Sequence, residues 1–292
     1  MITLDINTID NRQLYGFLTS AIVPRPIAFV STIDAAGKVN LSPFSYFTCV
    51  STRPPVLMIA PVRKSRDGGQ KDTFFNLKEV PECVISLVTY DMVEQMSLTS
   101  APFPKGINEF EKSGLTEAAS THVQPPRVKE SPVSFECKVT QIIELGENGG
   151  AGNVVLCEIL TIHVNEQVLD ENGKIDAYKI DAVARLGGSL YSRLIPESIF
   201  EIKKPETDIG IGVDALPKNI QTHTTLTGNE KGKLGSISAI PDVAELEQYP
   251  SLKILLERSE TLSDRMDIMK ALLSENRVKE AWLVALASGG MG

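Results

Sequence analysis

Two strand-like segments joined by a tight turn, within residues 25–47, place the strongest constraint on what this chain can fold into. Ile27–Ile33 is rich in β-branched and aromatic residues, which favour strands. Asp34–Gly37 has the composition of a turn, and its glycine can adopt a positive φ. A return strand is expected from Val39 until Pro43 interrupts it, because proline lacks the N–H that a sheet requires. The segment therefore predicts a hairpin.

The second half of this hairpin has the composition of a ligand-facing strand. Small polar residues stand beside proline and aromatic residues there: Asn40, Ser42, Ser45 and Tyr46 accompany Pro43, Phe44 and Phe47. That mixture suits a flat, partly polar ligand better than it suits a closed core.

Strand-like runs follow one another along the first 200 residues, with helical segments inserted between them. The further runs expected as strands are Val56–Pro61, Cys83–Tyr90, Ser134–Thr140 and Val154–Val164. The segments expected as helices are Asp10–Ser20, Phe74–Val80 and Asp91–Ser100. Because helices and strands do not alternate strictly, the order favours an antiparallel barrel over a doubly wound parallel sheet. No Gly-x-Gly-x-x-Gly motif follows a strand, and no Walker-type loop occurs.

Charge and hydropathy limit the partners of the chain. The formal net charge of −8 argues against nucleic acid as a main partner, although one local cationic pocket for a phosphate is compatible with it. No run of about 18 apolar residues is present, so we expect no membrane span. The N-terminus lacks the basic and apolar regions of a signal peptide, and a cytoplasmic protein is expected.

Residues that commonly carry out proton transfer or bind metals form no recognisable constellation. The four cysteines (Cys49, Cys83, Cys137 and Cys157) contain no Cys-x-x-Cys pair, so they are interpreted as buried free thiols, and no metal site is expected. The three histidines are isolated, and neither His-Glu-x-x-His nor Gly-x-Ser-x-Gly occurs. This absence is typical of proteins in which a bound cofactor carries the chemistry.

A basic loop within residues 63–73 is a candidate phosphate site. It holds four cations within nine residues: Arg63, Lys64, Arg66 and Lys71. Asp72 or Thr73 can cap the helix expected to begin near Phe74, and a helix N-terminus offers free N–H groups to an anion. A plain solvated loop remains the alternative.

A third segment, Arg185–Tyr191, contains the paired glycines Gly187 and Gly188. Glycines allow a backbone to approach a ligand closely, and Tyr191 could cover it. A plain turn remains the alternative.

Together these segments resemble the flavin reductase-like, FMN-binding split-barrel family over roughly residues 10–200. The resemblance is carried by the blocks Arg25–Phe47, Lys71–Asn76 and Arg185–Tyr191. It implies a mainly β fold, a Greek-key split β-barrel with inserted helices. It also implies a homodimer with FMN near the subunit interface.

The resemblance further implies a role for each block. Along the ribityl–phosphate end of FMN it places Ser31 and Thr32. Facing the isoalloxazine, largely through backbone groups, it places Asn40, Leu41, Ser42, Pro43, Phe44 and Ser45. Around the phosphate it places Arg63, Lys64, Lys71 and Thr73, with Asp72 orienting the loop. It places Arg185 near the site, contributed by the same subunit or by the other one.

The implied activity is hydride transfer from NAD(P)H to flavin N5. The alternative is an FMN-binding electron relay, similar to flavoredoxin, that accepts electrons from a protein partner. A third possibility is a split barrel that has lost flavin and serves as an interaction module.

Residues 1–202 are expected to form the split-barrel domain, and residues 203–292 are expected to form an extension beyond it. Glu206–Ile240 is polar and glycine-containing, which predicts irregular structure, whereas Asp242–Leu286 is expected to be helical. One apolar stripe follows helical spacing there: Leu252, Leu255, Ser259, Leu262, Met266, Met269 and Leu273. This extension is expected to pack on the barrel or on a dimer partner.

Overall fold

The computed structural model describes residues 1–202 and 209–288. The chain divides into two compact units, Met1–Phe200 and Glu201–Gly292, and each is described by itself. The expected domain boundary, between residues 202 and 203, adjoins the segment 203–208, which lies outside the described residues. The expected irregular segment begins within it, at Glu206.

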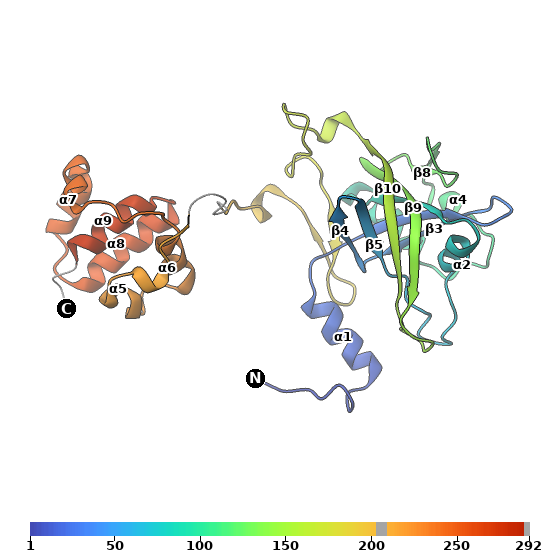
Figure 1. Ribbon diagram of the computed structural model, residues 1–292, viewed down its shortest axis with the longest axis horizontal. Helices are drawn as coiled ribbons and strands as arrows, with labels where there is room; N and C mark the ends of the chain where they lie inside the picture. Colours follow the sequence, from blue (N-terminus) through green and yellow to red (C-terminus); the bar gives the residue numbers. More distant parts are fainter. Residues whose placement is uncertain (203–208, 289–292) are drawn as a thin grey trace. The chain divides into compact units, whose positions relative to one another are not determined.

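Within residues 1–202, seven strands form one antiparallel sheet in the order β3-β2-β6-β9-β10-β5-β4 (Figure 1). The strands are β2 (Ala28–Ile33), β3 (Val39–Phe44), β4 (Phe47–Thr52), β5 (Pro55–Ile59), β6 (Glu82–Leu87), β9 (Val133–Glu144) and β10 (Asn153–Val164). The expectation of an antiparallel, mainly β core is therefore confirmed.

The inserted helices and the small sheets lie around this main sheet. The helices are α1 (Asn11–Ala21), α2 (Asp72–Glu79), α3 (Val93–Leu98) and α4 (Glu109–Ser113). A three-stranded sheet joins β1 (Arg25–Pro26), β11 (Val183–Arg185) and β12 (Tyr191–Arg193), and a two-stranded one joins β7 (Glu117–Ala118) and β8 (Arg127–Val128).

Strand β2 is buried along its whole length because both of its faces are covered. Ala28 and Val30 belong to a core cluster that includes Phe44 of β3 and Leu77 of α2. On the opposite face, Phe29 packs in a second cluster with the helical residues Met92, Met96 and Phe110. Side chains alternate along a strand, so β2 separates two hydrophobic cores.

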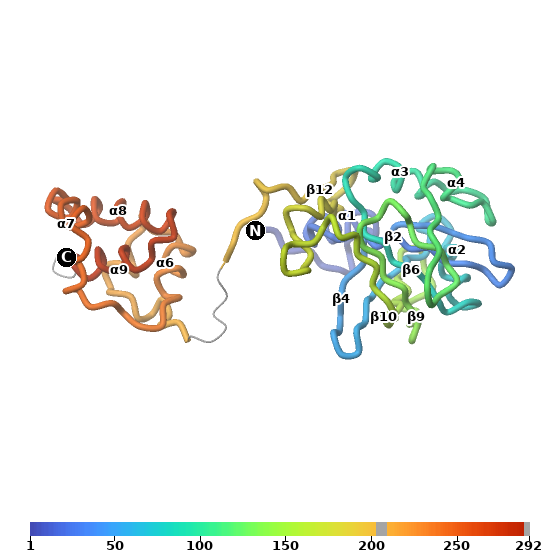
Figure 2. Tube along the Cα trace, turned by 90° about the horizontal axis from the view of Figure 1, so that it is seen from above, coloured from blue at the N-terminus to red at the C-terminus, as the bar shows by residue number. Residues whose placement is uncertain are grey.

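Three expectations about the first unit are wrong. Pro43 does not end its strand: β3 continues to Phe44, and Pro43 is paired in register with Phe29. A proline is tolerated there because β3 lies at an edge of the sheet. Strand β4 follows directly and was not expected; Figure 2 shows its hairpin projecting from the unit. Cys49 lies on β4 and is exposed, whereas the other three cysteines are buried thiols.

The second unit forms its own helical core. Its helices are α5 (Lys218–Thr222), α6 (Gly228–Gly235), α7 (Pro250–Glu257), α8 (Leu262–Ser274) and α9 (Val278–Ala287), gathered in one bundle in Figure 1. Trp282 is fully buried at its centre, and its indole N–H donates to the Leu234 carbonyl at 2.8 Å. Met266, Met269 and Leu273 pack in the same cluster.

Two expectations about this region are corrected. The segment expected to be irregular holds α5 and α6, because a reciprocal capping pair of Thr227 and Glu230 starts α6 despite its glycines. The single stripe is divided between α7 and α8, because the helix is interrupted at residues 258–261 and Thr261 caps α8. Leu255 consequently lies on an outer face of α7 and is 49% exposed. None of the helices in residues 1–202 and 209–288 has the length and apolar character needed to cross a membrane.

Candidate functional site

The first turn of α2 is fastened to β2 and β3 by buried polar side chains. Asn40 donates to the Thr73 hydroxyl at 3.0 Å, and Asn76 donates to the Thr32 hydroxyl at 3.1 Å. The β2–β3 register places Thr32 opposite Asn40, so both side chains lie on the face that α2 covers. Because both hydrogen bonds are buried, they fix where α2 begins relative to the hairpin.

Lys71 joins the basic loop to the hairpin. Its ammonium lies 5.1 Å from the centre of the Phe44 ring, a cation–π arrangement. Burial lowers the pKa of Lys71, and the nearby charge of Lys64 lowers it further. Neither lysine forms an ion pair with any residue in the described ranges. The two cations therefore lie close enough to repel one another, while the exposed Asp67 carboxylate lies within electrostatic range of Lys64.

The N-terminus of α2 lies beside these two cations and adds further donors for an anion. Lys71 occupies the N-cap position without a side-chain hydrogen bond, so the expectation that Asp72 or Thr73 caps the helix is wrong. Both residues lie in the first turn, where backbone N–H groups have no intrahelical acceptor. Free N–H groups beside two unpaired ammonium groups are the donor set that a phosphate monoester requires.

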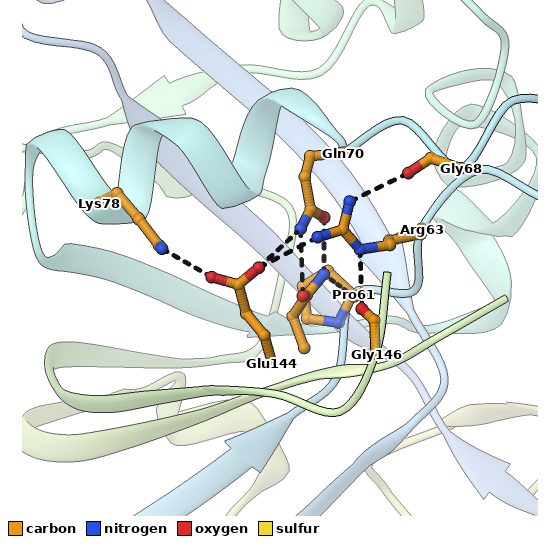
Figure 3. Close-up of polar contacts among 8 residues, drawn as sticks. Pro61, Arg63, Gly68, Gln70, Lys78, Glu144 and Gly146 are labelled. Carbon is orange, nitrogen blue, oxygen red and sulfur yellow. Dashed lines mark hydrogen bonds and ion pairs between the residues drawn. The ribbon is translucent and has the colours of Figure 1, made fainter. Parts of the chain in front are cut away.

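Arg63 holds the basic loop in shape (Figure 3). Its guanidinium donates to the Gly146 carbonyl at 3.0 Å, to the Gly68 carbonyl at 3.1 Å and to the Glu144 carboxylate at 3.1 Å. Glu144 also accepts from Lys78 at 2.7 Å, and this bond keeps the pKa of Glu144 below its usual value. All three guanidinium nitrogens of Arg63 thus donate hydrogen bonds to the loop or to the β9–β10 hairpin. Its direct contact with phosphate stays a prediction.

A second set of contacts fixes the other end of the loop. The amide groups of Gln70 and Asn153 exchange two hydrogen bonds, of 3.2 and 2.7 Å, and Asn153 also donates to the Pro61 carbonyl at 2.9 Å. A Cβ on Gly149 would lie 2.8 Å from the Ser65 carbonyl oxygen, so the two loops press against each other there. The loop that carries Lys64 and Lys71 is therefore preformed.

The remaining residues of the hairpin divide between two faces. Ser42 and Phe44 share the face of Asn40, and Ser42 is half-buried with no side-chain hydrogen bond to the described residues. Ser31 and Leu41 belong to the opposite face, where the Ser31 hydroxyl donates to the Pro126 carbonyl. The side chains of Ser31 and Leu41 are thus separated from Lys71 by the sheet, and their contact with a ligand stays a prediction.

A buried arginine, Arg25, connects Ser45 with the strand pair of Arg185, and the sequence analysis does not assign it to the site. Arg25 is paired with Arg185 across β1 and β11, and it donates to the Ser45 hydroxyl at 3.4 Å and to the Leu186 carbonyl at 3.0 Å. Arg185 donates to the Tyr191 hydroxyl at 2.9 Å, whereas its buried Nε has no partner among the described residues. Arg25 thus links Ser45 to the strand pair that contains Arg185, and the contact of Arg185 with a ligand stays a prediction.

Glu109 of α4 is a second residue missed as part of the site. Its carboxylate accepts from the Leu41 backbone N–H at 2.9 Å, which satisfies a donor on the edge strand β3. Burial raises the pKa of Glu109, the bond from Leu41 offsets part of the rise, and the charge of Asp72 adds to it. Glu109 therefore positions the strand that carries Asn40 and Ser42.

Replacing Glu109 by alanine is expected to destabilise the first unit by about 1–3 kcal/mol, because a buried N–H loses its acceptor. Glu109→Gln keeps an acceptor and should retain most of that stability. A raised native pKa means that the carboxyl contributes most below its ordinary pKa, and that this contribution is lost as the pH rises through the native pKa. Gln cannot titrate, so its stability relative to wild type should increase from about pH 4 to pH 7. Urea unfolding followed by β-sheet circular dichroism measures this; parallel pH profiles would contradict it.

Known proteins share this fold and sequence over the first unit. Residues 20–179, more than half of the chain, match the family model described as the flavin reductase-like domain. A protein of Aquifex aeolicus is 40% identical over 188 residues, covering 64% of this chain and 93% of that relative.

Two solved structures agree with that match. Nitrilotriacetate monooxygenase component B from Bacillus cereus is 31% identical with a TM-score of 0.65, covering 69% of this chain and 98% of that one. A Shewanella frigidimarina protein described as having a split barrel domain is 28% identical with a TM-score of 0.59, covering 68% of this chain and 96% of that one. The chain therefore belongs to the flavin reductase-like domain family and has its split-barrel fold, with a helical unit beyond it.

Proposed function

We propose that the first unit binds FMN and passes electrons from NAD(P)H to it. The observation that carries this proposal is the meeting of Lys64, Lys71 and the α2 N-terminus beside Phe44 and the half-buried Ser42. A dianionic phosphate between the lysines would relieve their mutual repulsion and compensate Lys71 for its lost hydration. A flat ring next to the phosphate would extend along the hairpin from Asn40 to Ser45.

In this proposal the chain binds and orients, and it need not transfer a proton itself. When bound, the flavin supplies a hydride acceptor for a reduced nicotinamide. Lys71 and Lys64 hold the phosphate, and the Asn40–Thr73 and Asn76–Thr32 hydrogen bonds keep α2 at a fixed distance from the hairpin. Glu109 keeps β3 in place through Leu41. Reactants held in a fixed arrangement react faster because less orientational freedom is lost at the transition state.

The homodimer remains part of the proposal. Helix α1 exposes Tyr15, Phe17 and Leu18, which are 57%, 42% and 46% accessible in a single chain. Apolar side chains gathered on one short helix are typical of a surface that a second copy covers.

Anaerobic mixing of the FMN-loaded protein with NADH and, separately, with NADPH tests the proposed activity. We expect at least one of them to bleach the visible absorbance of the flavin, while a chemical reductant bleaches it in every case. Bleaching by the chemical reductant alone would contradict direct oxidation of NAD(P)H and would favour the electron relay, whose donor is a protein.

A further inference from the structure

A pocket between α3 and the β11–β12 hairpin is lined by none of the residues around Lys71, although Arg185 contacts one of its walls, and we infer that it binds a small flat aromatic cation, such as an aryl amidine or amine. Its volume is about 220 Å³. The residues that line it are Tyr90, Val93, Glu94, Ser97, Val183, Tyr191, Ser192 and Arg193. The volume suits one ring with a short substituent, since drug-sized ligands occupy roughly 300–1,000 Å³.

The walls of the pocket are two tyrosines, each held by an arginine. The Arg193 guanidinium lies 3.8 Å from the centre of the Tyr90 ring, and it is fixed in turn by bonds of 2.6 and 2.9 Å to Asp181. The Arg185 guanidinium lies 4.8 Å from the centre of the Tyr191 ring and donates to its hydroxyl. The aromatic walls are therefore in place before any ligand arrives, which lowers the entropic cost of binding.

The lining combines apolar surface with polar groups that have no partner. Val183 is buried and Val93 half-buried, so the lining includes apolar surface. The exposed carboxylate of Glu94, the exposed hydroxyl of Ser97 and the half-buried hydroxyl of Ser192 have no side-chain hydrogen bond or ion pair within residues 1–202 and 209–288, so they are free to meet a ligand. Apolar walls with a few free polar groups are the usual composition of a small-molecule site.

Three carboxylates (Glu94, Asp91 and Asp181) and two guanidinium groups (Arg193 and Arg185) lie in or beside the pocket, and this excess of negative charge favours a cation. Glu94 lines it, and Asp181 and Asp91 both act on Arg193, whose pKa is raised first by its bond to Asp181 and then by the neighbouring Tyr90 and Asp91. The charge of Arg193 is thus already compensated by Asp181, whereas the exposed carboxylate of Glu94 and the guanidinium of Arg185, against the Tyr191 ring, form no ion pair with the described residues. A flat cation would pair with Glu94 and place its ring against a tyrosine face. An aromatic carboxylate of the same size would meet the charge of Glu94 instead.

Titration of the full-length protein with benzamidine, followed by ligand-observed NMR, tests this inference, with benzoate as the matched anion. We expect benzamidine to bind and benzoate not to bind. Glu94→Gln should weaken benzamidine binding roughly two- to fivefold, the range of an exposed ion pair. Ser97→Trp should abolish it by filling the pocket, and Glu171→Gln, which removes an exposed carboxylate outside the lining, should leave it unchanged.

Saturation with FMN separates this pocket from the proposed flavin site. The inference requires that benzamidine binding be the same with and without FMN. Displacement by FMN, equal binding of benzoate, equal binding in wild type and Ser97→Trp, or no benzamidine binding at all would overturn it. Because FMN binding is measured independently, failure of this pocket leaves the proposed flavin function untouched, and the reverse also holds.

Discussion

Replacing Lys71 by alanine should raise the dissociation constant for FMN roughly 10- to 150-fold, because a charge-assisted hydrogen bond contributes about 1.5–3 kcal/mol. Lys71 is half-buried at the N-cap of α2, and its pKa is lowered by burial and by the charge of another cation, Lys64. Removing Lys71 ends its repulsion with Lys64 and also removes its cation–π contact with Phe44, so the two effects oppose each other and the stability of the free protein should change by less than about 1 kcal/mol. Quenching of flavin fluorescence on titration gives the dissociation constant directly.

The matched control is Lys112→Ala. Lys112 lies in the last turn of α4, is exposed, and forms no side-chain hydrogen bond or ion pair with the described residues. We expect the Lys112→Ala variant to have the same dissociation constant for FMN as the wild-type protein. Equal FMN affinity in Lys71→Ala and wild type would show that the phosphate lies elsewhere.

Met269→Ala should lower the free energy of unfolding of the helical unit by about 2–5 kcal/mol, the usual cost of truncating a fully buried methionine. Met269 is 0% exposed and packs in the cluster around Trp282. Since Trp282 is the only tryptophan of the chain, its fluorescence during urea unfolding reports on this unit alone. The flavin site should keep its FMN affinity, because it belongs to the other unit.

Leu255→Ala provides the contrast. The sequence pattern assigns Leu255 and Met269 to one apolar stripe, whereas the structure leaves Leu255 49% exposed on α7. We expect a loss within about 0.5 kcal/mol for this change, as for most surface substitutions. Equal losses for the two variants would support the continuous stripe and contradict the division between α7 and α8.

Local patterns predicted the elements of the first unit well because strand alternation and turn composition depend on neighbouring residues. The hairpin within residues 25–47 and the helix after Lys71 are examples. Pro43 was misjudged because its effect depends on whether β3 lies at an edge, which is a property of the whole sheet. The apolar residues keep their helical spacing through residues 258–261, although the backbone there is not helical. The sequence pattern therefore does not reveal that α7 and α8 are separate helices.

The polar contacts of the site could be predicted only in part. The cations of the basic loop are visible in the sequence, but the partner of Arg63 is Glu144, 81 residues away. Glu109 reaches the Leu41 N–H across 68 residues, and Arg25 reaches the Leu186 carbonyl across 161. Such pairings follow from the packing of distant segments, so a single sequence carries no local signal for them. A charged residue next to a strand expected to be buried indicates that some partner is needed, but it does not indicate which residue that partner is.

The central claim, that Lys71 and the α2 N-terminus hold the phosphate of a flavin, is tested most directly by comparing FMN with riboflavin, which lacks the phosphate. We expect the wild-type protein to bind FMN much more tightly than riboflavin. In Lys71→Ala we expect most of this difference to disappear while riboflavin affinity is unchanged. Equal affinity of the wild-type protein for the two flavins, or no binding of either, would contradict it.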